Sequence, residues 1–165
     1  MQRPSFLTEA LLALLKRMIY TQIYDTEECT TQKGMRPMNR ETVNMVRSPI
    51  SVEGNIRLVP YYPAYDTALA WYQDAQLCKQ VDNRDSVYDL PLLKRMYHYL
   101  DTHGELFYIE YRGVLCGDVS LRTTGELAIV ICKEYQNKHI GRKVIEKMLE
   151  MARERGLAEC FAHIY

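Results

Sequence analysis

The sequence predicts an α+β fold with a mixed, mostly antiparallel sheet flanked by helices. Two segments with helical periodicity precede three strand-like segments that are separated by tight turns. An amphipathic helix and one more strand-like segment follow them. Of the 165 residues, 47% are hydrophobic and 25% are charged, which is enough apolar material to build the core of one domain with an extension.

The first 55 residues are expected to lie outside the folded domain. In residues 1–24, apolar side chains recur at helical spacing from Phe6 and Ala10 onward, which predicts an amphipathic helix that docks on another surface. Lys16 interrupts the apolar run, so it is too short for a membrane span of roughly 20 apolar residues. Residues 25–55 are polar and carry glycine and proline, and we interpret them as a linker.

The domain itself is expected to cover residues 56–165. Its expected elements are, in order, a strand at 56–59, helices at 66–81 and 90–102, strands at 105–111, 114–123 and 126–132, a helix at 141–155 and a strand at 158–165. Pro91 stands in a first helical turn, where its missing N–H costs nothing. The run at 127–131 is apolar on both faces, which suits a central strand covered from both sides.

Charge and cysteine content exclude several classes of function. Lys plus Arg and Asp plus Glu both number 21, so no basic excess indicates a binder of nucleic acid. The five cysteines are scattered, without the close spacing of a metal site or a disulfide framework. We therefore expect no metal, no nucleic-acid partner, no membrane insertion and a cytoplasmic location.

The segment from Ile129 to Lys143 carries the strongest functional signal. A buried strand runs into a polar loop that opens a helix, and such a helix start presents free N–H groups and a positive dipole end to an anion. Lys138 and Arg142 add charge, and Gly141 permits close approach to the main chain. From these residues alone, a phosphate site and a merely solvated helix start both remain open.

The same segment resembles the acetyl-CoA motif of the GNAT acetyltransferase superfamily, (Gln/Arg)-x-x-Gly-x-(Gly/Ala). The six places of the motif are filled by Gln136, Asn137, Lys138, His139, Ile140 and Gly141. Further segments resemble the branch that includes the ribosomal-protein alanine N-acetyltransferases: AWYQD at 70–74, GELFYIE at 104–110, GDV at 117–119 and KEYQ at 133–136. The expected order of elements is also that of the family.

The resemblance implies a function and a site. Acetyl-CoA would be the cosubstrate, with the N–H groups of Ile129 and Ile131 meeting the thioester carbonyl and the pantetheine arm. The amides from Gln136 to Arg142 would hold the diphosphate. A primary amine, from a small molecule or a protein N-terminus, would attack the thioester directly, without a metal. The alternative from another class is a non-catalytic acyl-CoA-binding module or a scaffold.

Two departures from the family pattern bear on this expectation. His139 stands where the family has a glycine, and its imidazole either crowds the diphosphate or donates a hydrogen bond to it. The sequence ends at Tyr165, whereas family members continue into a helix and further strands. Either this chain is a shortened form or another element completes the sheet. The N-terminal helix could cover the edge in this molecule, or a homodimer could form through that helix or the edge.

The catalytic residues are less well marked. Glu126 begins the central strand, where some family members keep a catalytic carboxylate; a solvated strand-end glutamate is the alternative. Weaker candidates for proton transfer are Glu105, Glu110, His98, His103 and His163. Aromatic residues that either line an acceptor groove or serve packing are Tyr61, Tyr62, Tyr65, Trp71 and Tyr88.

Overall fold

The computed structural model describes residues 48–162, in which five strands form one antiparallel sheet. The strands are β1 (Ile50–Ser51), β2 (Ile56–Pro60), β3 (Gly104–Tyr111), β4 (Val114–Arg122) and β5 (Leu127–Ile131). They lie side by side in chain order, and every neighbouring pair is antiparallel. The α+β architecture expected from the sequence is therefore confirmed.

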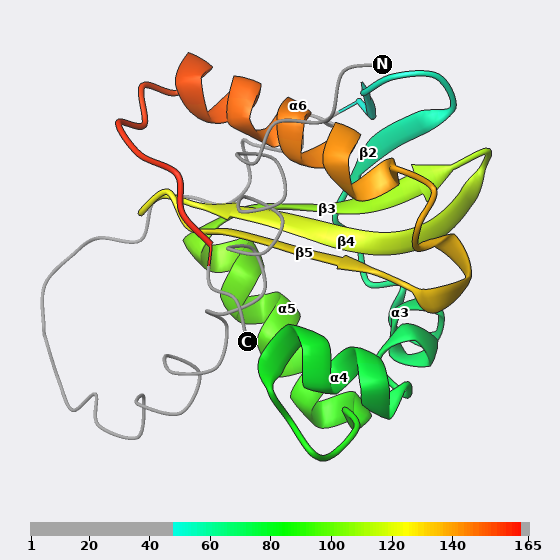
Figure 1. The fold of residues 1–165 in the computed structure, drawn as a ribbon. Coiled ribbons are helices and arrows are strands. Elements are labelled where there is room, and N and C mark those ends of the chain that lie inside the picture. The colour runs from blue at the N-terminus through cyan, green and yellow to red at the C-terminus, as the bar shows by residue number, and fades with distance from the viewer. Residues whose placement is uncertain (1–47, 163–165) are drawn as a thin grey trace, which may run out of the picture.

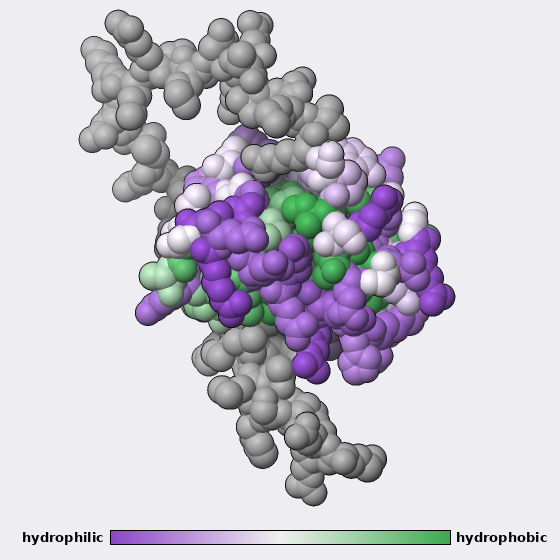
Figure 2. All heavy atoms as spheres, turned by 90° about the horizontal axis from the view of Figure 1, so that it is seen from above, coloured by the Kyte–Doolittle hydropathy of each residue, from purple (hydrophilic) through white to green (hydrophobic). Residues whose placement is uncertain are grey.

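Four helices among these residues cover the two faces of the sheet. The helices α3 (Tyr65–Trp71), α4 (Ala75–Asp82) and α5 (Leu90–His103) lie on one face, and α6 (Ile140–Glu154) lies on the other (Figure 1). Seen from the α6 side, the surface is mainly hydrophilic around a central strip of apolar side chains (Figure 2). This matches an amphipathic α6 that turns its apolar stripe to the sheet and its charged side chains to water.

The register of the strands decides which side chains meet which helices. One row across the sheet joins Leu58, Ile109, Gly117 and Ile131. This row faces α6, because a Cβ built on Gly141 would lie 3.3 Å from the Ile131 side chain. The neighbouring row joins Val59, Tyr108, Asp118 and Val130, and it must face the opposite helices because side chains alternate along a strand.

Most elements of the domain lie within two residues of their expected positions, but one expected helix was wrong. The helix expected at 66–81 is two helices, because the chain breaks between α3 and α4. Asp74 restarts it as the N-cap of α4, where its side chain accepts hydrogen bonds from the amides of Gln76 and Leu77. The apolar spacing continues across the break, so periodicity alone did not show it.

The two ends of the domain also differ from expectation. The strand β1 falls inside the segment interpreted as a linker, and it extends the sheet back to Ile50. Of the strand expected at 158–165, the described residues show one parallel bridge, between Glu126 and Phe161. The helix expected in residues 1–24 and the rest of the linker lie outside the described residues.

Candidate functional site

The outer edge of β5 is the first component of the site. The N–H of Arg122 donates to the carbonyl of Glu126 at 2.8 Å, and the N–H of Cys132 donates to that of Cys116 at 2.9 Å. Even-numbered residues of β5 therefore turn their main-chain groups toward β4. In an antiparallel ladder the alternate residues face the other way, so the N–H groups of Ile129 and Ile131 point to the outer edge.

The C-terminal segment meets this edge only at its beginning, within the residues described. The N–H of Leu127 donates to the carbonyl of Phe161 at 2.9 Å, and the N–H of Phe161 donates to that of Gly125 at 3.0 Å. Gly125 has φ +90°, and a Cβ there would lie 2.2 Å from the Glu159 carbonyl oxygen. Only glycine allows this close crossing. Through Ala162 the segment pairs no further along β5, which leaves the edge at Ile129 and Ile131 without a neighbouring strand.

The loop after β5 is the second component. It passes through a short 3-10 turn, η2 (Lys133–Tyr135), into the start of α6. The Gln136 side chain donates from Nε2 to the carbonyl of Ile131 at 2.9 Å, so it ties the loop to the β5 edge. The N-cap of α6, His139, makes no side-chain capping bond. The first amides of α6 thus lack both an intrahelical acceptor and a capping side chain.

The backbone of this loop explains the glycine of the family motif. Asn137 and His139 both have φ +60°, in the left-handed region. Such a conformation costs an ordinary L-residue about 1–2 kcal/mol, and glycine avoids that cost. Asn and His are among the residue types that are found there more often than others. His139 therefore supplies the same turn as glycine while placing an exposed imidazole at the start of α6.

The basic side chains predicted around the loop all have partners within the protein. Lys138 Nζ lies 4.7 Å from the centre of the Tyr135 ring. Arg142 Nε lies 3.0 Å from Glu146 Oε1, one turn along α6. Lys143 Nζ lies 2.8 Å from Oε1 of Glu53, which comes from the turn between β1 and β2. Positive charge is thus present as expected, but each cation is already paired.

Glu126 does not lie in water at the strand end, so the solvated alternative was wrong. Its residue is 5% exposed, and its carboxylate forms an ion pair with Arg122. The Arg122 guanidinium in turn donates to the Tyr99 hydroxyl at 2.5 Å and lies over the Tyr99 ring. To accept a proton from a substrate, Glu126 would have to leave this ion pair. Its role as a general base stays a prediction.

The weaker candidates lie in different places. Glu110 forms an ion pair with Arg57 on β2, and Glu105 forms one with Arg155 after α6. His103 stacks on Tyr99 with ring centres 4.2 Å apart. His98 is exposed on α5, and His163 lies outside the described residues.

The aromatic candidates divide into core and surface residues. Trp71 and Tyr88 are buried, which favours the packing interpretation for these two. Tyr61 and Tyr65 are half-buried with their hydroxyl oxygens 3.3 Å apart, and Tyr62 is 48% exposed. These three tyrosines stay candidates for the acceptor side.

The sequence did not indicate a buried acid network on the α5 side of the sheet. Asp118 on β4 accepts hydrogen bonds from the hydroxyls of Tyr72 and Tyr97, and burial raises its pKa to about 7 despite both bonds. Asp82 accepts from Tyr88, and burial raises its pKa to about 6. An aspartate in the middle of the apolar run of β4 was the signal for this network.

The described residues show neither a metal centre nor a membrane span. Within residues 48–162, no three or more His, Cys, Asp or Glu side chains form a group that could hold a metal ion. None of the helices described is long and apolar enough to cross a membrane.

Comparison with known proteins agrees with this geometry. The fold is similar to a GNAT-family acetyltransferase from Bacillus anthracis, at a TM-score of 0.52 and 12% identity, with 66% of this chain and 68% of that chain covered. It is also similar to the Salmonella typhimurium acetyltransferase that modifies the N-terminal serine of ribosomal protein L7/L12, at 0.53 and 12%, covering 66% and 70%. For the Vibrio cholerae spermidine N-acetyltransferase, solved with CoA and spermine, the values are 0.51, 18%, 59% and 63%.

The sequence itself supplies the assignment, since structural likeness at such low identity shows only the fold. No curated protein sequence matches the chain. Residues 68–165, which are more than half of the chain, match the acetyltransferase (GNAT) family. The chain therefore belongs to the GNAT acetyltransferase family.

Proposed function

We propose that this protein transfers an acetyl group from acetyl-CoA to a primary amine. The observation that carries the proposal is the unpaired edge of β5, which leads directly into the uncapped start of α6. The N–H groups of Ile129 and Ile131 would bind the thioester carbonyl and the amide-rich arm. The amides from Gln136 through Asn137, Lys138, His139, Ile140 and Gly141 to Arg142 would bind the diphosphate.

The residues present fit such a ligand. Alternate residues on a strand edge lie about 6.6 Å apart and repeat their N–H direction, which suits an extended arm that carries amide groups of its own. At the start of α6, a Cβ on Gly141 would already lie at 3.3 Å from Ile131, so the missing side chain keeps the helix close to β5. Anions bind well at such helix starts because free N–H groups and the helix dipole act together.

Direct attack by a neutral amine needs three contributions from the protein. Holding the two substrates together lowers the entropic cost of their reaction. The N–H of Ile129, directed to the edge, would stabilise the developing oxyanion. A group that accepts the amine proton is also needed, and Glu126 on the α5 face of the sheet is the candidate that we retain.

We further propose that the acceptor is a peptide N-terminus or a small polyamine-like amine. The segments at 70–74, 104–110, 117–119 and 133–136 support the peptide, since they resemble the ribosomal-protein N-acetyltransferase branch. The exposed Tyr62 beside the half-buried Tyr61 and Tyr65 supports a cationic acceptor, because aromatic faces attract ammonium groups.

The experiment combines calorimetric titration of the full chain with acetyl-CoA and an assay for free CoA thiol with a panel of amines. The expected result is binding, followed by thiol release that depends on the amine. Binding without thiol release for any amine would identify the non-catalytic acyl-CoA module instead. Absence of both binding and a thermal shift with CoA would leave only the scaffold alternative.

A further inference from the structure

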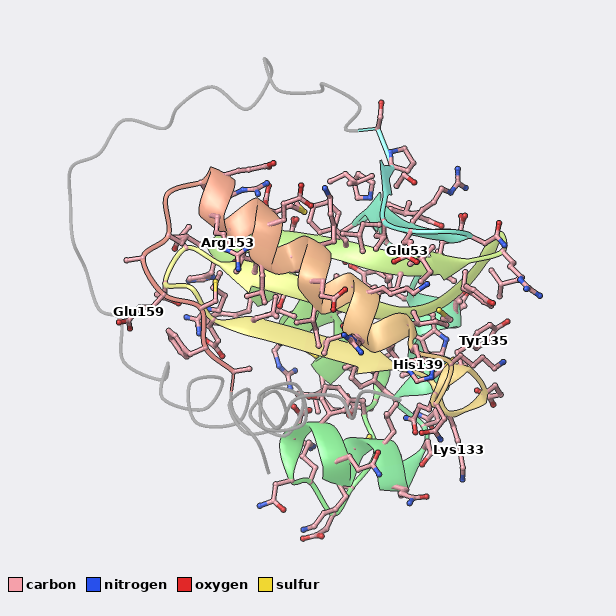
Figure 3. The ribbon with its side chains drawn as sticks, turned by 45° about the horizontal axis from the view of Figure 1, so that its top comes forward. Glu53, Lys133, Tyr135, His139, Arg153 and Glu159 are labelled. Atoms are coloured by element: carbon pink, nitrogen blue, oxygen red, sulfur yellow. The ribbon has the colours of Figure 1, made fainter. Side chains whose placement is uncertain are left out.

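The ion pair between Lys143 and Glu53 joins two distant parts of the chain at the proposed diphosphate site. The two residues are 90 positions apart, and Lys143 Nζ lies 2.8 Å from Glu53 Oε1. Lys143 stands in the first turn of α6, whereas Glu53 stands in the turn between β1 and β2. Both Glu53 and His139 lie at the end of the sheet where the loop runs into α6, and Arg153 and Glu159 lie at the opposite end (Figure 3).

The position of Glu53 is fixed by its turn. The N–H of Ile56 donates to the Glu53 carbonyl at 3.3 Å, and the N–H of Val52 donates to the Ile56 carbonyl at 3.0 Å. Gly54, with φ +63°, closes the turn. The strand β2 that follows is the central part of an antiparallel pair with β3, so the turn is anchored to the sheet. Its carboxylate is therefore held near α6 and does not reach it from a free chain end.

An acidic side chain at a helix start acts on an anion in two ways. It repels the anion directly, and it occupies a cation that the anion would otherwise use. Lys138 and Arg142 are paired with near neighbours in sequence, Tyr135 and Glu146. Lys143 is the basic side chain of this loop and helix start that is paired with a distant segment.

We infer that Glu53 lowers the affinity of the α6 start for the diphosphate of CoA by holding Lys143. Binding of the diphosphate breaks the Lys143–Glu53 ion pair and transfers Lys143 to the phosphate oxygens. Glu53 is thus an affinity-determining residue of the donor site, and its effect favours release of free CoA after transfer. This inference rests on the proposed function, because it concerns the same site.

The size of the effect follows from exposure. The Glu53 side chain is 66% exposed and that of Lys143 is 34% exposed, so solvent screens the pair. Exposed ion pairs typically contribute a few tenths to one kcal/mol, which corresponds to about a two- to fivefold change in affinity.

The test measures dissociation constants for acetyl-CoA by calorimetry at low and at physiological salt. E53Q is expected to bind about two- to fivefold more tightly than the natural protein, with a smaller gain at higher salt. The matched control is E150Q, which removes the same charge from α6. Glu150 pairs with Lys147 and lies about 15 Å along the helix from its first residue. Because 15 Å exceeds a Debye length of about 8 Å, E150Q is expected to leave the affinity unchanged.

A double-mutant comparison shows whether the effect passes through Lys143. In a K143Q background, E53Q is expected to change the affinity by less than about 1.5-fold. The same titrations with inorganic pyrophosphate as the probe are expected to give the same order of affinities. Unchanged or weaker binding by E53Q overturns the inference, as does an equal gain from E150Q. If the natural protein binds no acetyl-CoA, the proposed function fails first, and the inference fails with it.

Discussion

Tyr72 and Tyr97, from different helical segments, both donate a hydrogen bond to the same carboxylate oxygen of Asp118, at 3.0 and 2.8 Å. Asp118 is 3% exposed, and it stands on β4 opposite Val130 of β5. The pair of phenols thus joins the helical layer to the strand that supports the β5 edge. A buried carboxyl of this kind links the stability of the domain to pH.

We predict that the stability of the domain decreases between about pH 4 and pH 7. Burial raises the pKa of Asp118 from 3.8 to about 7 and that of Asp82 to about 6. In this window the folded state binds more protons than the unfolded state, so the free energy of unfolding falls as pH rises. The contribution is complete below pH 3.8 and is lost above about pH 7.

The measurement is urea unfolding of the natural protein and D118N across that window. D118N cannot ionise at this position, so it should gain stability relative to the natural protein as pH rises, by on the order of a few kcal/mol. A difference between the two proteins that stays constant from pH 4 to pH 8 contradicts the prediction. Arg57→Gln, which removes a half-exposed charge, should show no such trend.

Gly125→Ala should destabilise the crossing of the C-terminal segment. The new Cβ would meet the Glu159 carbonyl oxygen at 2.2 Å, and φ there is +90°. Gly113→Ala is the matched control, because φ is +81° but nothing lies within 4 Å of its Cβ. We expect about 1 kcal/mol of destabilisation for the control and at least about 2 kcal/mol for Gly125→Ala. Equal losses by thermal unfolding would show that the close contact has no cost.

His139→Gly should stabilise the fold. The φ of +60° is strained for histidine and free for glycine, although glycine gains entropy in the unfolded chain. We expect a net gain of up to about 1 kcal/mol in urea unfolding. Acetyl-CoA affinity of the same variant separates the two open interpretations, since tighter binding indicates crowding by the imidazole and weaker binding indicates donation. Lower stability of His139→Gly would show that the imidazole has contacts that outweigh the strain.

Arg122→Met should destabilise the domain by about 3 kcal/mol, because it leaves the Glu126 carboxylate buried without its cation. Lys147→Met, which breaks an exposed ion pair with Glu150, should change stability by less than about 1 kcal/mol. The measurement is chemical unfolding of both variants. A small loss for Arg122→Met would indicate that water reaches Glu126. Glu126→Gln with acetyl-CoA binding intact then tests the base, whose loss should reduce turnover at least about a hundredfold.

The local elements and the donor loop could be predicted from the sequence because their signals are local. Alternation and tight turns located β3, β4 and β5 within two residues. Apolar spacing located α6, and the motif from Gln136 to Gly141 indicated the loop before it. The break between α3 and α4 escaped because the apolar spacing is the same on both sides of it.

The sequence by itself determined the order of the elements and the run of main-chain amides offered by the loop into α6. Only the tertiary structure decided that Ile129 and Ile131 face the open edge, since this depends on the hydrogen-bond register with β4. It also decided that Glu53 pairs with Lys143 and that Tyr72 and Tyr97 pair with Asp118. Those partners are far apart in the chain, and spacing along a sequence carries no information about which distant side chains the folded sheet and helices bring into contact.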